Sequence, residues 1–244
     1  GSGSGGSGSA SQDPHLVFPN GARADFRGYD DGYFNFVSYP SMSVNIRTQK
    51  STYNLRGVRV NGTFITEAFV NGITSDGKVV RLEHSSLRAN SYNWAYRMVN
   101  GTCDGHSFYV FPHLKKSCGN DFKVKVDFSS SDISFKKWRL RVSTNNVYNH
   151  IGGASKRLDI RIAGPRTNVS HGIFGQSFNR DIKVLNGRLD KYPRNGTFQT
   201  SAQAEGSIQG NYHMYAVSSP FGNDFKFSKF HEHQTDDVSN EILE

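Results

Sequence analysis

The chain has 244 residues, of which 35% are hydrophobic and 13% aromatic, and its formal net charge is +8. The aromatic content excludes a disordered chain, and no stretch approaches the roughly 20 apolar residues that a membrane-spanning helix needs, so we expect no membrane span. The 25 glycines, with many Asn and Ser, indicate numerous turns. The length allows one large or two small domains.

Residues 1–11 read GSGSGGSGSAS, a Gly/Ser/Ala run of low complexity. Such a composition is typical of flexible coil. We therefore interpret the run as an engineered linker outside the fold. A single domain is then expected over residues 12–230, followed by a flexible tail at 231–244.

Alternation of apolar and polar residues dominates the chain and predicts β-strands with one solvated face. It is clearest over 122–128, where the apolar residues share one side and the charges the other, and it recurs at 138–142 and 158–162. Further strands are expected at 22–27, 33–38, 44–46, 63–70, 79–82, 93–98, 107–111, 147–151 and 224–228.

Turn signals such as Asn20-Gly21, Asp31-Gly32 and Asn71-Gly72 separate these segments at short intervals. Short, regularly interrupted strands predict an all-β fold, either a large antiparallel β-sandwich or an open barrel with few short helices. Helices are expected only at 194–206 and 235–244. From about residue 164 alternation weakens, which indicates either a smaller loop-rich subdomain or a lid that returns a strand to the main sheet.

Two segments carry a family resemblance. The first joins Asp13-Pro14-His15 to Asp25-Phe26-Arg27-Gly28 and the aromatic-rich Gly32-Tyr33-Phe34-Asn35-Phe36-Val37. It resembles the opening of von Willebrand factor type D modules and of related domains named for a Gly-Asp-Pro-His tetrad. The second, His171-Gly172-Ile173-Phe174-Gly175-Gln176-Ser177-Phe178, resembles the Gly-Leu-x-Gly-x-Phe signature near the end of such modules.

The chain departs from this family at two positions. Gln12 stands where Gly is usual, and Phe174 stands where Cys is usual. The many disulfides of vertebrate modules are also missing, so the chain is closer to the Cys-poor algal and root-cap-like relatives. The resemblance implies a secreted module that acts in extracellular adhesion or matrix assembly and is not an enzyme, self-cleavage aside.

The Asp13-Pro14 bond has chemistry of its own. The aspartyl carboxyl can attack its own carbonyl carbon and expel the prolyl nitrogen, and water, a matrix hydroxyl or an amine can then open the resulting anhydride. His15, with an ordinary pKa near 6.5, is a candidate to donate a proton or to orient the carboxyl. The structural alternative is a turn that leads into a strand.

The resemblance also implies calcium, because family modules place Asp and Asn oxygens after the second signature and calcium prefers such ligands. The candidates are Asn179 and Asp181, joined by Asn186, Asp190, Asp25, Asp30 and Asp31. Their alternative role is that of solvated turn residues. His231 and His233 could share zinc, but no third ligand follows at a characteristic spacing.

The only two cysteines, Cys103 and Cys118, close a loop of about 15 residues. In an oxidising compartment we expect a disulfide, worth roughly 3 kcal/mol in the chain-entropy model; the alternative is two buried thiols. Asn-x-Ser/Thr acceptors favour a secreted, extracellular or cell-surface protein. Glycosylation is expected at Asn61, Asn100, Asn168 and Asn195.

The positive charge predicts attraction to polyanions, which for a secreted protein are extracellular polysaccharides or other anionic matrix or surface components. No nucleic-acid-binding motif appears, so a nucleic-acid partner is not expected. A polyanion-binding face is predicted from Lys115, Lys116, Lys136, Lys137, Arg139 and Arg141, with a merely solvated surface as the alternative.

Two other functions stay open. A carbohydrate- or polyanion-binding module without covalent chemistry could use the aromatic stripe Tyr92, Trp94 and Tyr96. An extracellular hydrolase could pair Glu67 with Asp76 or Glu83, although the chain has no nucleophile elbow, phosphate loop or His-Glu-x-x-His motif.

Overall fold

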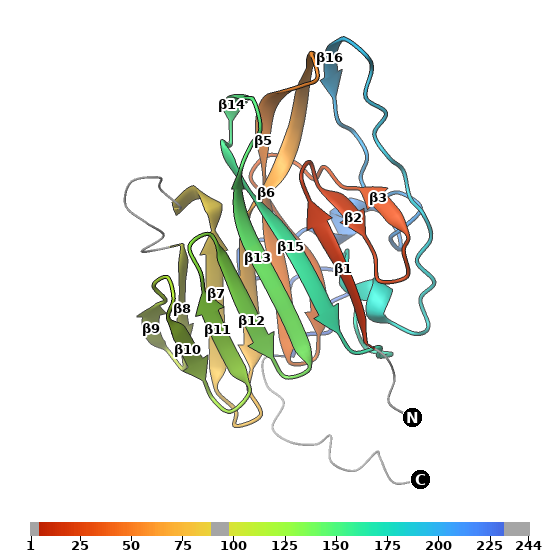
Figure 1. Cartoon of the computed structure of the whole chain (residues 1–244). Coiled ribbons are helices and arrows are strands. Elements are labelled where there is room, and N and C mark those ends of the chain that lie inside the picture. Colours follow the sequence, from red (N-terminus) through yellow and green to blue (C-terminus); the bar gives the residue numbers. More distant parts are fainter. Residues whose placement is uncertain (1–4, 89–97, 232–244) are drawn as a thin grey trace.

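The computed structural model describes residues 5–88 and 98–231 (Figure 1). It confirms the predicted all-β fold: two large antiparallel sheets pack over a common core as a sandwich, and neither sheet closes into a barrel. Helical structure in the described residues is limited to three short 3-10 turns, η1 (Ser86–Arg88), η2 (Gly175–Phe178) and η3 (Tyr212–Tyr215). None of these reaches the length and apolarity of a membrane span.

The first sheet has eight strands. Their spatial order is β10 (Lys115–Cys118), β11 (Phe122–Val126), β12 (Ser130–Phe135), β13 (Trp138–Asn146), β15 (Lys156–Gly164), β1 (Gly6–Ser11), β2 (His15–Val17) and β3 (Arg23–Asp25). In this sheet the predicted alternation is confirmed. Phe122, Val124 and Val126 of β11 are buried, whereas Lys123 and Lys125 are exposed.

The second sheet follows the order β14 (His150–Gly153), β5 (Met42–Leu55), β6 (Val58–Ile73), β7 (Val79–Ser85), β8 (Val99–Cys103) and β9 (His106–Tyr109). Strand β4 (Gly32–Tyr39) also pairs with β5, and β16 (Gly196–Gln199) runs parallel to β6. The long β5–β6 hairpin extends past the first sheet (Figure 1). A small second core at this hairpin contains Tyr53, Val60 and Phe64.

Strand β1 corrects the expectation of a flexible linker. It pairs with β15 from Gly6 opposite Gly164 to Ala10 opposite Ile160, and with β2 on its other side. The small residues allow this close packing: a Cβ on Gly8 would lie 2.6 Å from the Phe174 ring and 2.3 Å from the Val17 carbonyl oxygen. The Gly/Ser run thus behaves as an alternating strand, with glycine and alanine toward the core and serine toward solvent.

The chain from residue 165 to 231 is mostly irregular and covers the second sheet. Phe221 packs against Phe69, and Asn45 donates to the carbonyl oxygens of Pro220 and Gly222. Because of this cover, β6 is buried on both faces over most of its length. The side chains that the segment contributes to the main core are Ile173, Phe174, Phe178, Val184, Ala204, Ile208, Tyr215, Val217 and Phe225.

Two predicted elements of this segment are wrong. No helix forms over 194–206; instead Gly196–Gln199 pairs with β6. No strand forms over 224–228, although Phe225 is buried there. The strand expected at 93–98 lies outside the described residues except for Met98, and so do the helix at 235–244 and the tail beyond His231.

Candidate functional site

The loop Gln12-Asp13-Pro14 connects β1 to β2 and lies beside the β5–β6 hairpin. Ser11 and His15 are its flanking strand partners. Gln12 has a φ of 60°, in the left-handed region that favours glycine. Its backbone N–H donates to Asp159 Oδ1 at 3.0 Å. The fold therefore demands a glycine-like conformation at the position where the resembling family carries Gly.

The Asp13 carboxyl is buried below the loop, at 6% exposure. Its Oδ2 accepts hydrogen bonds from the hydroxyls of Tyr53 at 3.2 Å and Tyr192 at 2.9 Å. A Cβ on Gly62 would lie 2.9 Å from the same oxygen, so glycine at this position of β6 leaves room for the acid.

Burial raises the pKa of Asp13 to about 6, although the Tyr192 hydrogen bond and the nearby His15 act in the opposite direction. Burial likewise raises the pKa of both tyrosines, which therefore stay protonated and act as donors. The site holds a carboxyl that is neutral in mildly acidic conditions and is fixed next to a prolyl peptide bond.

His15 forms the second part of the site with Asp25 of β3. The imidazole Nδ1 lies 2.5 Å from Asp25 Oδ1, and this hydrogen bond raises the pKa of His15, while partial burial opposes it. Asp25 Oδ2 accepts from the Asp190 backbone N–H at 2.8 Å. When Asp25 Oδ1 accepts from Nδ1–H, the neutral imidazole carries its lone pair on Nε2.

The site assembles residues from distant parts of the chain. Asp190 and Tyr192 come from the irregular segment that follows the second signature, and they reach Asp25 and Asp13. The two segments that carry the resemblance also contact each other directly, since the Phe36 and Phe174 rings stack with their centroids 5.1 Å apart. They are thus parts of one folded body.

Tyr53, Gly62 and Tyr192 were not predicted as site residues. No spacing rule connects them to Asp13, because the tyrosines lie 40 and 179 residues away along the chain. Asp25 and Asp190 were predicted only as calcium partners. Among the described residues, no group of three or more His, Cys, Asp or Glu side chains is arranged to hold a metal ion.

The calcium candidates Asn179 and Asp181 have other environments. Asn179 is buried; its Nδ2 donates to the carbonyl oxygens of Asn168 and Ser170, and its Oδ1 accepts from the Asp181 backbone N–H. The Asp181 side chain is exposed. The Asn179 amide therefore organises the loop after η2.

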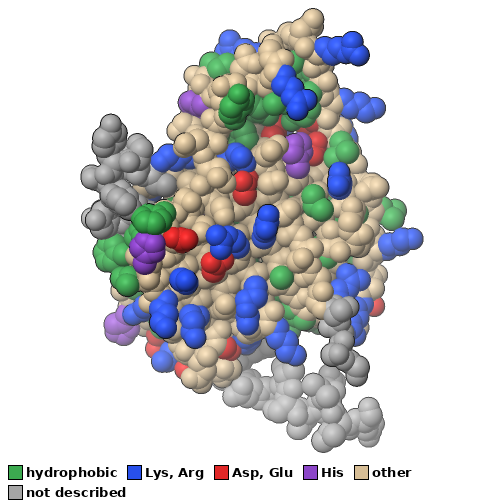
Figure 2. Space-filling view, in the orientation of Figure 1, with side chains coloured by type: hydrophobic (Ala, Val, Ile, Leu, Met, Phe, Trp, Pro, Cys, Tyr) green, Lys and Arg blue, Asp and Glu red, His purple; other side chains and the backbone are tan. Residues whose placement is uncertain are grey.

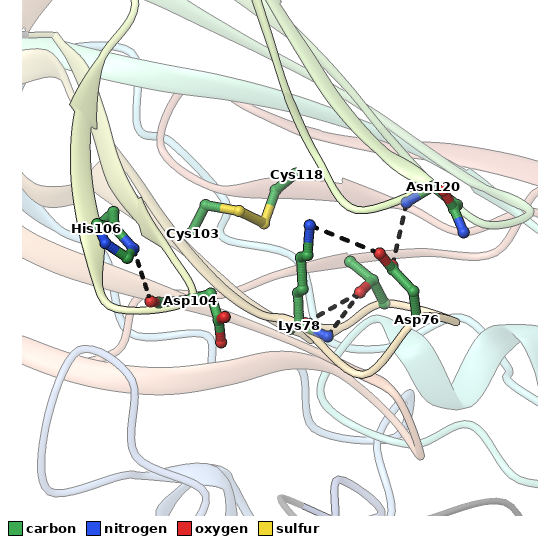
Figure 3. Close-up of a disulfide and its surroundings, with 8 residues drawn as sticks. Asp76, Lys78, Cys103, Asp104, His106, Cys118 and Asn120 are labelled. Atoms are coloured by element: carbon green, nitrogen blue, oxygen red, sulfur yellow. Dashed lines mark hydrogen bonds and ion pairs between the residues drawn. A yellow bond between two sulfur atoms is a disulfide. The ribbon is translucent and has the colours of Figure 1, made fainter.

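The predicted disulfide between Cys103 and Cys118 is confirmed (Figure 3). It joins β8 of the second sheet to β10 of the first. The same corner is held by Asp76, whose carboxylate accepts from the Asn120 backbone N–H at 3.1 Å and lies 3.8 Å from the Lys78 ammonium. The bond thus connects one edge of the sandwich across its two layers.

The four predicted glycosylation acceptors differ in exposure. Asn168 and Asn195 are exposed, whereas Asn61 and Asn100 are half-buried. Asn61 also accepts from the Thr52 hydroxyl at 2.9 Å. A glycan on the folded surface is therefore best accommodated at Asn168 and Asn195.

The predicted basic face is divided by the structure. Arg139 and Arg141 project from the solvent side of β13, and Lys115 is the strand partner of exposed Lys125. Lys116 lies over the Phe108 ring, and Lys136 and Lys137 form the tight turn between β12 and β13.

Of the residues named for the other two functions, the structure describes those of the candidate hydrolase pairs. Glu67 is buried and accepts from Arg47 at 2.7 Å and from Ser85 at 2.8 Å. Asp76 belongs to the disulfide corner, away from Glu67 at the other end of the β6–β7 pairing. Tyr92, Trp94 and Tyr96 lie outside the described residues, as does His233.

In the comparison with known proteins, no family model matches the sequence, and no curated protein matches it. The resemblance to type D and Gly-Asp-Pro-His modules therefore rests on the two quoted segments alone.

Proposed function

We propose that this chain is an extracellular adhesive or matrix module that cuts its own backbone between Asp13 and Pro14. The observation that carries the proposal is the burial of the Asp13 carboxyl beside Tyr53 and Tyr192, with a pKa of about 6. A neutral acid of this kind can supply both the attacking oxygen and the proton that the leaving nitrogen requires.

The proposed step is balanced without any added reagent. A carboxyl oxygen of Asp13 bonds to the carbonyl carbon of the same residue, and a five-membered cyclic anhydride closes as the bond to the Pro14 nitrogen breaks. The carboxyl proton ends on that nitrogen, which leaves as a secondary amine. Water then opens the anhydride to a C-terminal aspartate; a matrix hydroxyl or amine in its place forms an ester or an amide.

Among the described residues, hydrogen bonds to the carboxyl reach only Oδ2, so Oδ1 is the attacking oxygen in this scheme. The His15–Asp25 pair has a positioning role. It fixes the loop that follows the scissile bond, as does the Phe26 N–H, which donates to the Pro14 carbonyl oxygen at 2.9 Å.

The extracellular assignment is supported by the disulfide and by the exposed acceptors Asn168 and Asn195. Disulfides persist in oxidising compartments and are rare in the cytosol. The adhesive role is supported by the resemblance and by the anhydride chemistry, which could attach the chain to a hydroxyl-rich matrix.

Intact mass spectrometry tests the cleavage. The folded chain is incubated between pH 4 and pH 8, and cleavage is expected to be faster below the Asp13 pKa of about 6. The control is the same chain in urea at the same pH, since Asp13-Pro14 is the only Asp-Pro bond of the sequence. Equal rates in the folded and unfolded chains would contradict catalysis by the fold.

Three substitutions separate the chemistry from the fold. Asp13→Asn removes the acid and Pro14→Ala removes the easily expelled nitrogen, so both are expected to stop cleavage. Tyr192→Phe keeps the Asp13 carboxyl and the Pro14 nitrogen but removes one hydrogen bond to Asp13 Oδ2. If the native chain keeps its intact mass at every pH, the proposed self-cleavage is contradicted, whereas the description of the fold is unaffected.

A further inference from the structure

The solvent face of the first sheet carries a patch of positive charge. Figure 2 shows Lys and Arg side chains spread over this face with few acidic ones between them. The patch consists of exposed cations from the edge strand β10 and from β11, β13 and β15. Its members are Lys115, Lys123, Lys125, Arg139, Arg141 and Arg161, and we call this set the basic face.

The strand register aligns these cations in rows that cross the sheet. Lys125 pairs with Asp132, Asp132 with Arg141, and Arg141 with Arg161. Since neighbouring strands lie roughly 4.8 Å apart, the row from Lys125 to Arg161 spans ~14 Å. A second row contains Lys123 and Arg139. They lie two residues before Lys125 and Arg141 on the same strands, β11 and β13.

A shallow groove of about 500 Å³ lies within the basic face. Arg139, Arg141 and Arg161 line it, and its floor includes the small residues Ser7, Ser9 and Ser134. Ser7 and Ser9 belong to β1. Because their side chains are small, the surface of the sheet is hollowed at this strand, and the groove forms there.

The charge of the basic face is only partly neutralised. Asp132 accepts two hydrogen bonds from Arg141, both at 2.9 Å. Across the part of the chain that the structure describes, Lys123, Lys125 and Arg161 have no carboxylate partner. Three cations are therefore free to bind an external anion.

We propose that this groove binds a linear anionic polysaccharide that lies across the strands. The rows of cations match a chain with regularly repeated charges. Arginine presents a planar fork that suits sulfate and carboxylate groups, and serine hydroxyls can bind sugar hydroxyls. Single-stranded nucleic acid is less suited, because none of the described residues that line the groove is aromatic and could stack on bases.

This inference does not depend on cleavage at Asp13. The experiment therefore uses the full chain with Asp13→Asn, which cannot form the anhydride and keeps β1 attached. Binding is measured by calorimetry or biolayer interferometry to dextran sulfate, polygalacturonate, neutral dextran and an oligo-dT strand, from about 0.05 to 0.2 M salt.

The test variant is Lys123→Gln/Lys125→Gln/Arg161→Gln in the same background. The matched control is Arg56→Gln/Arg59→Gln/Lys191→Gln, which removes the same charge from exposed positions outside the basic face. We expect the test variant to bind the anionic polysaccharides at least ~10-fold more weakly, with a salt slope lower by up to about three. The control should change affinity less than about twofold.

Binding to dextran sulfate, to polygalacturonate or to both supports the proposal and identifies the acid group. Three results would overturn it: equal losses in the test and control variants, equally tight binding of neutral dextran, or oligo-dT binding as tight as that of the polysaccharides. Thermal unfolding of both variants verifies that they are folded.

Discussion

Replacing Asp13 with Asn should change how the stability of the fold depends on pH. Asn keeps an oxygen that can accept from Tyr53 and Tyr192 but has no charge to bury. The native carboxyl must ionise inside the fold once the pH exceeds its pKa. The comparison of native chain and variant therefore isolates the free energy of ionising one buried group.

The magnitude follows from the pKa. Folding raises the pKa of Asp13 from 3.8 to about 6, so the folded state holds this proton more tightly than the unfolded state. Each pKa unit corresponds to about 1.4 kcal/mol, which makes the full effect about 3 kcal/mol. Below pH 3.8 Asp13 is protonated in both the folded and the unfolded state, so no unfolding free energy is lost. As the pH rises from 4 to 6, the native chain should lose this stability relative to the variant.

Urea unfolding between pH 4 and pH 8 measures the difference in unfolding free energy between Asp13→Asn and the native chain, whose integrity is verified by mass. Asp181→Asn, in an exposed loop, is the control and should give a constant difference. If the Asp13→Asn difference is also constant across this range, the carboxyl is not buried as described, and the proposed cleavage chemistry loses its basis.

Three other substitutions test the packing. Gln12→Gly should raise the unfolding free energy by about 1 kcal/mol, because it relieves a positive φ; a decrease would contradict this conformation. Exchange of both Cys103 and Cys118 for Ser should lower it by about 3 kcal/mol, measured by urea unfolding against the oxidised chain, and no change would argue against the disulfide. Gly8→Ala should lower the melting temperature, at a cost of about 1–3 kcal/mol, whereas Gly152→Ala, with open space around it, should not; equal effects would refute the packing of β1.

Strands β11, β13 and β15 of the first sheet were predictable because one face of that sheet is solvated, whereas β1, β2, β10 and β12 were not predicted. Alternation marked β11, β13 and β15, and the charges opposite the core made the pattern plain. In the second sheet the long strands were predicted too short. Strand β6 spans Val58–Ile73, longer than the expected 63–70, because the irregular C-terminal segment buries its outer face as well and removes the alternation.

Composition misled the prediction at β1, where a Gly/Ser run that is usually flexible forms a strand. The strict alternation of Gly or Ala with Ser over Gly6–Ser11 was the available signal. The Asp13 loop was recognised from three adjacent residues. Tyr53 and Tyr192 could not be predicted as site residues from the sequence, because only the folded chain brings their hydroxyls to the Asp13 carboxyl.

The position of β1 also shapes how the chain reaches its native state. Strand β1 is synthesised well before its partner β15, since Gly6 pairs with Gly164. Until then its backbone is unpaired, which in an apolar strand would invite aggregation. Glycine and serine have low hydrophobicity and low strand propensity. The unpaired β1 segment therefore has a low tendency to aggregate with other unfolded chains. Completion of the first sheet is therefore expected late in folding, with a slow closing step that reflects the long loop between the two strands.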